Sequence, residues 1–355
     1  MVRVSFNNRN AVFLQTLRER VDAYFASQNI KPSGDYRLYL KTAVLILAAV
    51  ALYIVLVFFT PAPPIAILLC VLMGFSFSSI GFNVMHDGAH GSYSSIPWVN
   101  EIMARSLEVM GGSTFMWRFK HNVVHHTYTN IDGMDDDIDV KPFMRISPTQ
   151  PVRGYHRFQH IYWVFFYAIM LVFWVFYADF QKYFARKIGE MDIKKMTPRD
   201  HVEFWLGKVL HFSLFVGIPI WQVGLVPVII GYFTVLLVAG FGTSIVFQLA
   251  HVVEETQFPV PTGDPARIEN EWAIHQVVTT ANFATRNKLI SWLMGGLNFQ
   301  IEHHLFPKIS HVHYPQISKI VKEICAMYNI PYTEYPTMLS SIRSHVRHLK
   351  QMRFA

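Results

Sequence analysis

Three groups of histidines are the residues of this sequence best able to do chemistry, and each stands where an apolar run meets polar sequence. Two imidazoles four residues apart on a helix lie on one face, about 6 Å apart, and can bind one metal ion. HDGAH and HNVVHH both contain this spacing, and QIEHH forms the third group. The candidate ligands in these groups are His86, His90, His121, His125, His126, Gln300, His303 and His304.

Two of the groups contain adjacent histidines, His125/His126 and His303/His304. Successive residues on a helix point about 100° apart, so neighbouring imidazoles suit two nearby ions better than one. The twin pairs therefore predict a dinuclear centre. Imidazole favours iron, copper, nickel or zinc, and the lack of thiolates at these positions counts against a zinc finger. The scarcity of carboxylates there counts against calcium or magnesium.

The elements that must position these groups are apolar. Charged residues make up 15% of the chain and hydrophobic ones 52%, whereas an ordinary soluble domain carries about 25% charged residues. No charged side chain occurs from Thr42 to His86 or from Val209 to Val253. A membrane span needs about 20 apolar residues, so each run predicts two crossings joined by a turn. The expected fold is an all-α integral membrane protein with two helical hairpins, interfacial helices and a cytosolic histidine-rich cap.

The predicted transmembrane segments are 42–60, 65–84, 209–223 and 228–248. A further uncharged run, 158–178, is as long as one span. If it crossed the membrane, the basic residues that follow it would lie outside, against the positive-inside bias. We therefore expect this run to form an interfacial helix. Its crossing would also separate the histidine groups onto opposite faces.

The charge balance indicates a membrane rather than a nucleic acid. The 31 basic and 24 acidic residues give a net charge of +7, and the basic residues crowd beside the apolar runs. The positive-inside bias places both termini and the histidine groups on the cytoplasmic side, as in a bacterial inner membrane. No nucleic-acid motif accompanies the basic residues. We expect a cytosolic segment at 1–41 with an amphipathic helix at 10–27, a membrane domain at 42–310, and a cytosolic segment at 311–355.

Other residue types carry weaker indications. No signal peptide is expected, because polar or amphipathic sequence precedes the first apolar segment. Cys70 and Cys325 match neither a disulfide framework nor a zinc pattern. One or two acidic residues near the histidine groups are expected to orient ligand imidazoles, and the others to form a solvated acidic loop. These acidic residues are Asp87, Asp135, Asp136, Asp137, Asp139 and Glu302.

Histidines also occur outside the three groups. His251 ends the second hairpin on the side of the groups, which favours a ligand role over an interfacial hydrogen bond. His275, in WAIHQ, has no comparable indication. The others are expected at the surface, in packing or against lipid headgroups, and they are His156, His160, His201, His211, His311, His313, His345 and His348.

The three groups, in this order and spacing, resemble the signature of the membrane fatty acid desaturases, H-x(3-4)-H, H-x(2-3)-H-H and H/Q-x-x-H-H. The resemblance covers about residues 40–310. The glutamine that begins the third group and the surrounding NVMHDGAHGSYS and GGLNFQIEHHLFP are similar to the front-end branch. The resemblance implies two non-haem iron ions held by the histidines of the three groups and by His251. Gln300 departs from an all-histidine pattern, so it binds iron directly, through water, or only by orienting a ligand.

The resemblance also implies an activity. Such an enzyme uses O₂ to insert a double bond into a long-chain acyl substrate carried by CoA, a carrier protein or a lipid, held in an apolar tunnel. No HPGG motif of a fused cytochrome b5 is present, so electrons are expected from a separate ferredoxin or cytochrome b5-type protein. Candidates to hold an anionic headgroup or CoA are Arg105, Arg118, Lys120 and the lysine-rich stretch 182–208, unless these are ordinary membrane-flanking charges.

Three other functions stay open at this point. The same scaffold supports hydroxylation or modification of acetylenic or sphingoid substrates, which the motifs separate poorly from desaturation. A bis-histidine haem electron carrier would place histidine pairs deep within facing helices rather than at helix ends. A receptor with a remnant site would not need intact histidine groups.

Overall fold

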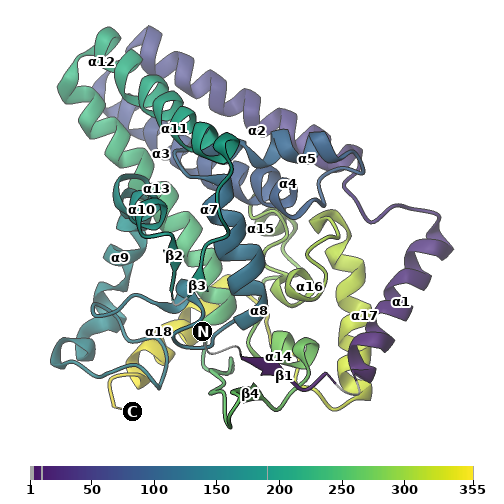
Figure 1. Cartoon of the computed structure of the whole chain (residues 1–355). Coiled ribbons are helices and arrows are strands. Elements are labelled where there is room, and N and C mark those ends of the chain that lie inside the picture. The colour runs from purple at the N-terminus through teal and green to yellow at the C-terminus, as the bar shows by residue number, and fades with distance from the viewer. Residues whose placement is uncertain (1–3, 9–10, 190, 355) are drawn as a thin grey trace.

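The computed structural model describes residues 4–8, 11–189 and 191–354. In that part of the chain the fold is mainly helical, as expected, with long helices above a layer of shorter ones (Figure 1). It contains three two-stranded sheets, of which two join distant segments and one joins neighbouring segments. They pair β1 (Ser5–Phe6) with β4 (Arg267–Ile268), β2 (Lys187–Ile188) with β3 (Met191–Asp192), and β5 (Asn282–Phe283) with β6 (Glu334–Tyr335).

The first hairpin is longer than its uncharged run. α2 (Tyr36–Ile54) begins six residues before the predicted span, because the Asp35 side chain caps the helix by accepting from the Arg37 N–H at 2.9 Å. It continues through a π-helical turn, Val55–Phe59. α3 (Pro63–Ile80) returns and passes through a second π-helical turn, Gly81–Met85, into α4 (His86–His90). The first histidine group is therefore the end of a long apolar helix.

The second hairpin also starts in polar sequence. α11 (Pro198–Phe212) begins eleven residues before the predicted span, because Thr197 and Asp200 form a capping box with Pro198 at the first helical position. A π-helical turn at Ser213–Gly217 precedes α12 (Ile218–Val223). The helix thus changes its hydrogen bonding just before Pro219. α13 (Leu225–His251) then returns to the histidines.

A fifth long helix consists of α9 (Gln159–Phe173), a π-helical turn at Trp174–Ala178, and α10 (Asp179–Ala185). Both of its ends contact the segment 132–150, which follows the second histidine group. Near one end, Gln159 Nε2 donates to the Arg145 carbonyl at 2.9 Å, and near the other, Lys182 Nζ donates to Asp136 at 2.7 Å. Five helices are long and apolar enough to cross a membrane, namely Tyr36–Phe59, Pro63–His90, Gly154–Ala185, Pro198–Val223 and Leu225–His251.

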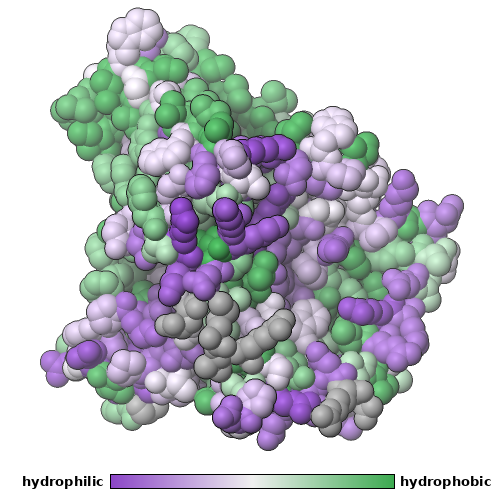
Figure 2. All heavy atoms as spheres, viewed as in Figure 1, coloured by the Kyte–Doolittle hydropathy of each residue, from purple (hydrophilic) through white to green (hydrophobic). Residues whose placement is uncertain are grey.

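Close helix packing joins the apolar layer. α13 packs against α3 and α9, and a glycine permits each approach. A Cβ at Gly74 would lie 2.9 Å from the Val235 carbonyl oxygen, and one at Gly240 would overlap the Ala168 carbonyl oxygen. In Figure 2 hydrophobic residues cover the upper left of this face, over α11 to α13, and hydrophilic residues gather across the middle and below. This division identifies a membrane protein with a polar layer on one side.

Shorter helices make up the polar layer. α1 packs on α17 and α14, and it buries Phe13, Leu17, Val21 and Phe25. An amphipathic helix was expected at 10–27, and α1 buries one apolar face in this way. Bounds of these helices are α1 (Val12–Gln28), α5 (Pro97–Ala104), α6 (Ser106–Val109), α7 (Thr114–Arg118), α8 (His126–Tyr128), α14 (Trp272–Val278), α15 (Lys288–Leu293), α16 (Gln300–Leu305), α17 (Tyr314–Met327) and α18 (Met338–Gln351).

Candidate metal centre

The helix ends and the polar layer bring all nine sequence-predicted ligands together. α4 supplies His86 and His90, α13 supplies His251, and α16 supplies the third group. The second group lies on a π-helical turn, Phe119–His125, and at the start of α8. All nine side chains are buried. Residues separated by more than 200 positions in the sequence thus form one cluster.

The ring nitrogens fall into groups with the dimensions of metal sites. His86, His90, His121 and His303 each offer a nitrogen within 4.8 Å of the others, and so do His125, His251 and His304. A further grouping of His121 and His125 with Asp137 meets the same limit. His126 lies between the first two groups, with ring centroids 4.6 Å from His303 and 4.4 Å from His304.

A π-helical turn changes which histidines of the second group share a face. Hydrogen bonds in a π-helix join residues five apart instead of four. His121 Nε2 accordingly lies 3.2 Å from His126 Nε2, five residues on. His121 belongs with His86, at 3.3 Å between Nε2 atoms, whereas His125 joins His251 and His304. The i,i+4 pair His121/His125 was expected to bind one ion. In the two all-histidine groups, however, His121 and His125 belong to different groups.

The imidazole nitrogens of the cluster are arranged for binding metal ions rather than for hydrogen bonding to one another. The Nε2 atoms of His90, His125, His303 and His304 are buried without a hydrogen-bond partner in the described part of the chain, which costs about 1–3 kcal/mol for each polar atom. Nitrogens about 2.1 Å from one ion at an angle of about 100° lie about 3.2 Å apart, as the close pairs here do. Two metal ions would satisfy these atoms.

The protonation of the rings also suits metal binding. Burial holds the pKa of His121, His126, His303 and His304 well below the usual range of imidazole, so these rings are neutral. Neutral imidazole is the form that binds metal. For His125, burial opposes protonation, but the Asp135 carboxylate outweighs it and raises the pKa.

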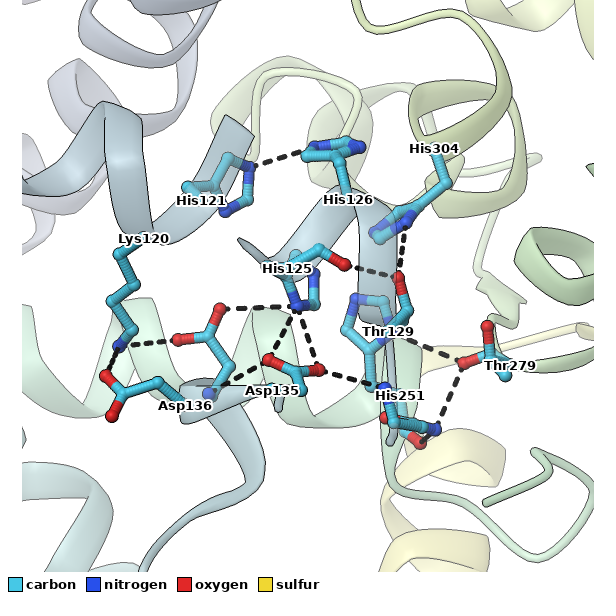
Figure 3. A network of polar contacts seen from close by, with 12 residues as sticks. Lys120, His121, His125, His126, Thr129, Asp135, Asp136, His251, Thr279 and His304 are labelled. Atoms are coloured by element: carbon cyan, nitrogen blue, oxygen red, sulfur yellow. Dashed lines mark hydrogen bonds and ion pairs between the residues drawn. The ribbon is translucent and has the colours of Figure 1, made fainter. Parts of the chain in front are cut away.

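Carboxylate and amide groups orient two of the rings. His125 Nδ1 lies 3.1 Å from Asp135 Oδ2 (Figure 3), and Asp135 is itself held by the Asn130 N–H at 2.9 Å. His304 Nδ1 lies 2.8 Å from Gln276 Oε1, which also accepts from the Thr129 hydroxyl at 3.0 Å. When Nδ1 carries the proton, Nε2 is free to bind metal. Asp135 is thus in contact with a predicted ligand, as expected of one or two of the acidic residues.

Tyr314 contacts the cluster of His86, His90, His121 and His303, because its hydroxyl lies 3.1 Å from His303 Nδ1. Tyr314, Gln276 and Thr129 were not predicted, because these uncharged residues lie outside the histidine motifs. Gln300 is buried beside the cluster of His125, His251 and His304. Its Nε2 lies 3.2 Å from His251 Nε2, and its Oε1 is unpartnered among the described residues. The two ends of an amide are interchangeable by rotation, so its oxygen can face His251.

The other acidic residues have different partners. Asp87 accepts from the Ser310 hydroxyl at 2.7 Å and lies 3.0 Å from His311 Nδ1. Glu302 accepts from Asn282 and Tyr332, and burial raises its pKa to about 7. The expected solvated acidic loop is instead ion-paired, since Lys120 Nζ lies 2.6 Å from Asp137 and 3.3 Å from Asp136.

Histidines outside the site serve mainly in packing. The surface and headgroup alternatives were wrong for His156, His211, His311, His313, His345 and His348, which are buried. His211 Nε2, for example, lies 2.7 Å from the Tyr232 hydroxyl. His275 is buried with both ring nitrogens unpartnered within the described residues, and it belongs to none of the metal-site groups.

An apolar cavity adjoins the cluster. It has a volume of about 60 Å³ and lies among α3, α9 and α13, and His86 and Trp117 form part of its lining. The Trp117 indole stacks on His121 with a centroid distance of 4.4 Å. The combination defines a helical membrane protein with a buried histidine cluster, of dimensions suited to metal binding, beside an apolar cavity.

Comparison with known proteins agrees with this description. Residues 61–336 match the family model described as "Fatty acid desaturase". The chain is similar to the sn-1 linoleoyl-lipid 6-desaturases of Arthrospira platensis (38% identical, 96% of this chain, 92% of the relative) and of a Synechocystis strain (36%, 99% and 98%). It is also similar to an acyl-lipid (8-3)-desaturase of Physcomitrium patens (37%, 97% and 72%).

The chain belongs to the fatty acid desaturase family. It is therefore an enzyme, an oxygen-dependent oxidoreductase that desaturates fatty acyl chains.

Proposed function

We propose that this enzyme inserts a double bond into a long-chain acyl group carried by a membrane lipid, between an existing double bond and the carboxyl end. The observation that carries the proposal is the apolar cavity that reaches His86 of the metal site. The printed names of the relatives describe acyl-lipid and lipid-linked substrates. A lipid carrier is accordingly favoured over CoA or a carrier protein.

Two iron ions are proposed as the cofactor. One would be held by His86, His90, His121 and His303, and the other by His125, His251 and His304. His126 and Gln300 lie between or beside these sets. Bound iron supplies the activation of O₂ that unactivated C–H bonds require. Two hydrogens from the substrate, two protons and two external electrons balance the reduction of O₂ to two water molecules.

The chain's own residues position and protect this chemistry. Asp135, Gln276 and Tyr314 hold the Nδ1 sides of ligand rings, so that Nε2 points into the cluster. The apolar cavity wall excludes water and holds the acyl chain. Trp117 stands between the cavity and the cluster, because it lines the one and stacks on His121 of the other.

A topology with four crossings is proposed, in which α9 and α10 lie in the interface. Both ends of that helix contact the segment 132–150 beside the metal site, which supports placing them on one side of the membrane. Both termini and the site then face the cytoplasm of a bacterial inner membrane. Labelling of cysteines introduced at Ala185 and Ala62 from either side tests this arrangement, since only the second site is expected to react from outside.

A separate acidic electron carrier, of the ferredoxin or cytochrome b5 type, is proposed to dock beside Lys120. Lys120 Nζ lies 2.6 Å from Asp137, whose carboxylate lies 3.4 Å from His125 Nδ1. The side chains of Lys120 and Asp137 are 28% and 23% exposed, so two contacts lead from the surface to a proposed ligand. Lys182 Nζ also pairs with Asp136, at 2.7 Å, and exposed basic residues follow Lys182 in the chain, at Arg186, Lys187, Lys194 and Lys195.

Complementary charge raises association rates and makes them sensitive to salt. The double substitution Lys194→Glu/Lys195→Glu is therefore expected to slow donor-supported turnover while leaving a single turnover of dithionite-reduced enzyme unchanged. Lys319→Glu, on α17, is the matched control. Equal donor dependence in all three proteins would place the docking site elsewhere.

Expression in a bacterium, followed by mass spectrometry of the lipids, tests the activity itself. The wild-type chain is expected to introduce a new double bond, His125→Ala to abolish it, and His201→Ala, a half-buried histidine outside the cluster, to retain it. A hydroxylated product would establish the alternative reaction on this scaffold. A Soret band in the purified protein, or no new unsaturation despite bound iron and a working reductant, would contradict the proposal.

A further inference from the structure

A buried ion pair behind the cavity wall has no role in the reaction proposed above. Asp179 of α10 and Lys208 of α11 lie 2.8 Å apart, and their side chains are 2% and 4% exposed. Both residues fall within helices long and apolar enough to cross a membrane. Ionisable groups in such helices are costly and usually functional, and a buried ion pair contributes little net stability. The groups that this pair holds in place indicate its role.

The first of these groups is the indole of Trp174, which lines the cavity. Trp174 Nε1 donates to Asp179 Oδ1 at 2.7 Å, while Asp179 Oδ2 accepts from Lys208. Because both carboxylate oxygens are engaged, the indole is held in one orientation. The Lys208 ammonium is enclosed in turn by the rings of Phe180 and Phe204, 5.2 and 5.4 Å from their centroids.

The second is the turn 109–112, two of whose residues also line the cavity. Lys208 Nζ donates to the Gly111 carbonyl at 2.6 Å, and His211 Nδ1 lies 2.9 Å from the Val109 carbonyl. Gly111 has a φ of +95°, and a Cβ there would lie 2.9 Å from the His211 ring. The turn is therefore fixed by side chains of α11 and is closely packed against them.

From these contacts we infer that Asp179 and Lys208 are positioning residues that set where along the acyl chain the double bond forms. They fix Trp174 and the turn 109–112 relative to His86, which lines the same cavity. An apolar chain has no polar group that fixes how far it slides, so the shape of the wall must set its register. The inference rests on the proposed function, because it takes the cavity as the acyl site.

The sharpest test removes one hydrogen bond from the wall. Trp174→Phe keeps an aromatic ring in place but removes the indole N–H and one of the two fused rings. Trp163→Phe is the matched control, because Trp163 is a buried residue of α9 that is not among the cavity-lining residues. A double variant, Asp179→Asn/Lys208→Met, removes both charges together and leaves no unpaired buried ion. The readout is the ratio of double-bond positional isomers, measured by mass spectrometry beside the amount of folded protein.

We expect the wild type and Trp163→Phe to give one dominant position. In Trp174→Phe and the double variant, neighbouring positions should rise about fivefold relative to the main one, as the loss of one hydrogen bond of ordinary strength predicts. Loss of stability alone lowers the yield without changing this ratio. If the double variant does not accumulate, Trp174→Phe decides the question.

An unchanged ratio in Trp174→Phe, with an active wild type and yields that follow the folded protein, would overturn the inference. A wild-type chain that forms no double bond would overturn the proposed function and this inference with it. The two failures are therefore distinguishable.

Discussion

The contacts on the Nδ1 sides of the imidazoles predict that the affinity for each of the two proposed metal ions can be lowered separately. Gln276 Oε1 lies 2.8 Å from Nδ1 of His304, which belongs to one group of nitrogens. The Tyr314 hydroxyl lies 3.1 Å from Nδ1 of His303, which belongs to the other. Gln276→Leu and Tyr314→Phe each remove one of these contacts with little change of side-chain volume.

The magnitude follows from what each contact does. Loss of a group that orients a ligand imidazole lowers metal affinity about 10- to 100-fold, which corresponds to about 1.4–2.7 kcal/mol. Gln276→Leu also removes one acceptor of the buried Thr129 hydroxyl, which keeps the His125 carbonyl at 2.7 Å, so effects of similar size are expected from the two substitutions. Each substitution should act on one ion, because neither Gln276 nor Tyr314 contacts a histidine of the opposite group.

Iron bound by the purified enzyme, titrated against a competing chelator, measures this effect. The wild type is expected to bind two ions, and each variant to hold one as the wild type does and to lose the other at a 10- to 100-fold lower chelator concentration. Tyr328→Phe is the matched control for Tyr314→Phe, because the Tyr328 hydroxyl contacts only Thr16 among the described residues. Parallel loss of both ions in either variant would refute the assignment of two separately supported groups.

Two further outcomes are expected. Gly240→Ala should lower the thermal unfolding midpoint in detergent, since its Cβ would overlap the Ala168 carbonyl at a cost of about 1–3 kcal/mol. The control Gly217→Ala, where the nearest neighbour of the new Cβ is 3.7 Å away, should be neutral or stabilising by about 0.5–1 kcal/mol. Equal midpoints for the two variants would contradict the close packing of α9 and α13. Removal of iron by a chelator should lower the midpoint and its return should restore it, because an ion that binds only the folded chain stabilises it; an unchanged midpoint would show that the cluster does not hold metal.

Much of the site was predictable because its spacing is local. His86 and His90 are four apart on one helix and their ring centroids lie 4.6 Å apart, as the sequence pattern indicates. The ends of the apolar helices were less predictable, because capping residues such as Asp35 and Thr197 extend them beyond the uncharged runs. The support from Gln276 and Tyr314 depends on contacts between distant segments, which leave no periodic or charged signal in the sequence.

The second histidine group illustrates why spacing alone is insufficient. In an α-helix, His121 and His125 would share a face, whereas His126 would point elsewhere. The π-helical turn Phe119–His125 instead brings His121 and His126 to 3.2 Å between Nε2 atoms. His125 is thereby turned toward His251 and His304. This short segment can supply both groups of ring nitrogens because its hydrogen bonding changes from i,i+4 to i,i+5 within the motif.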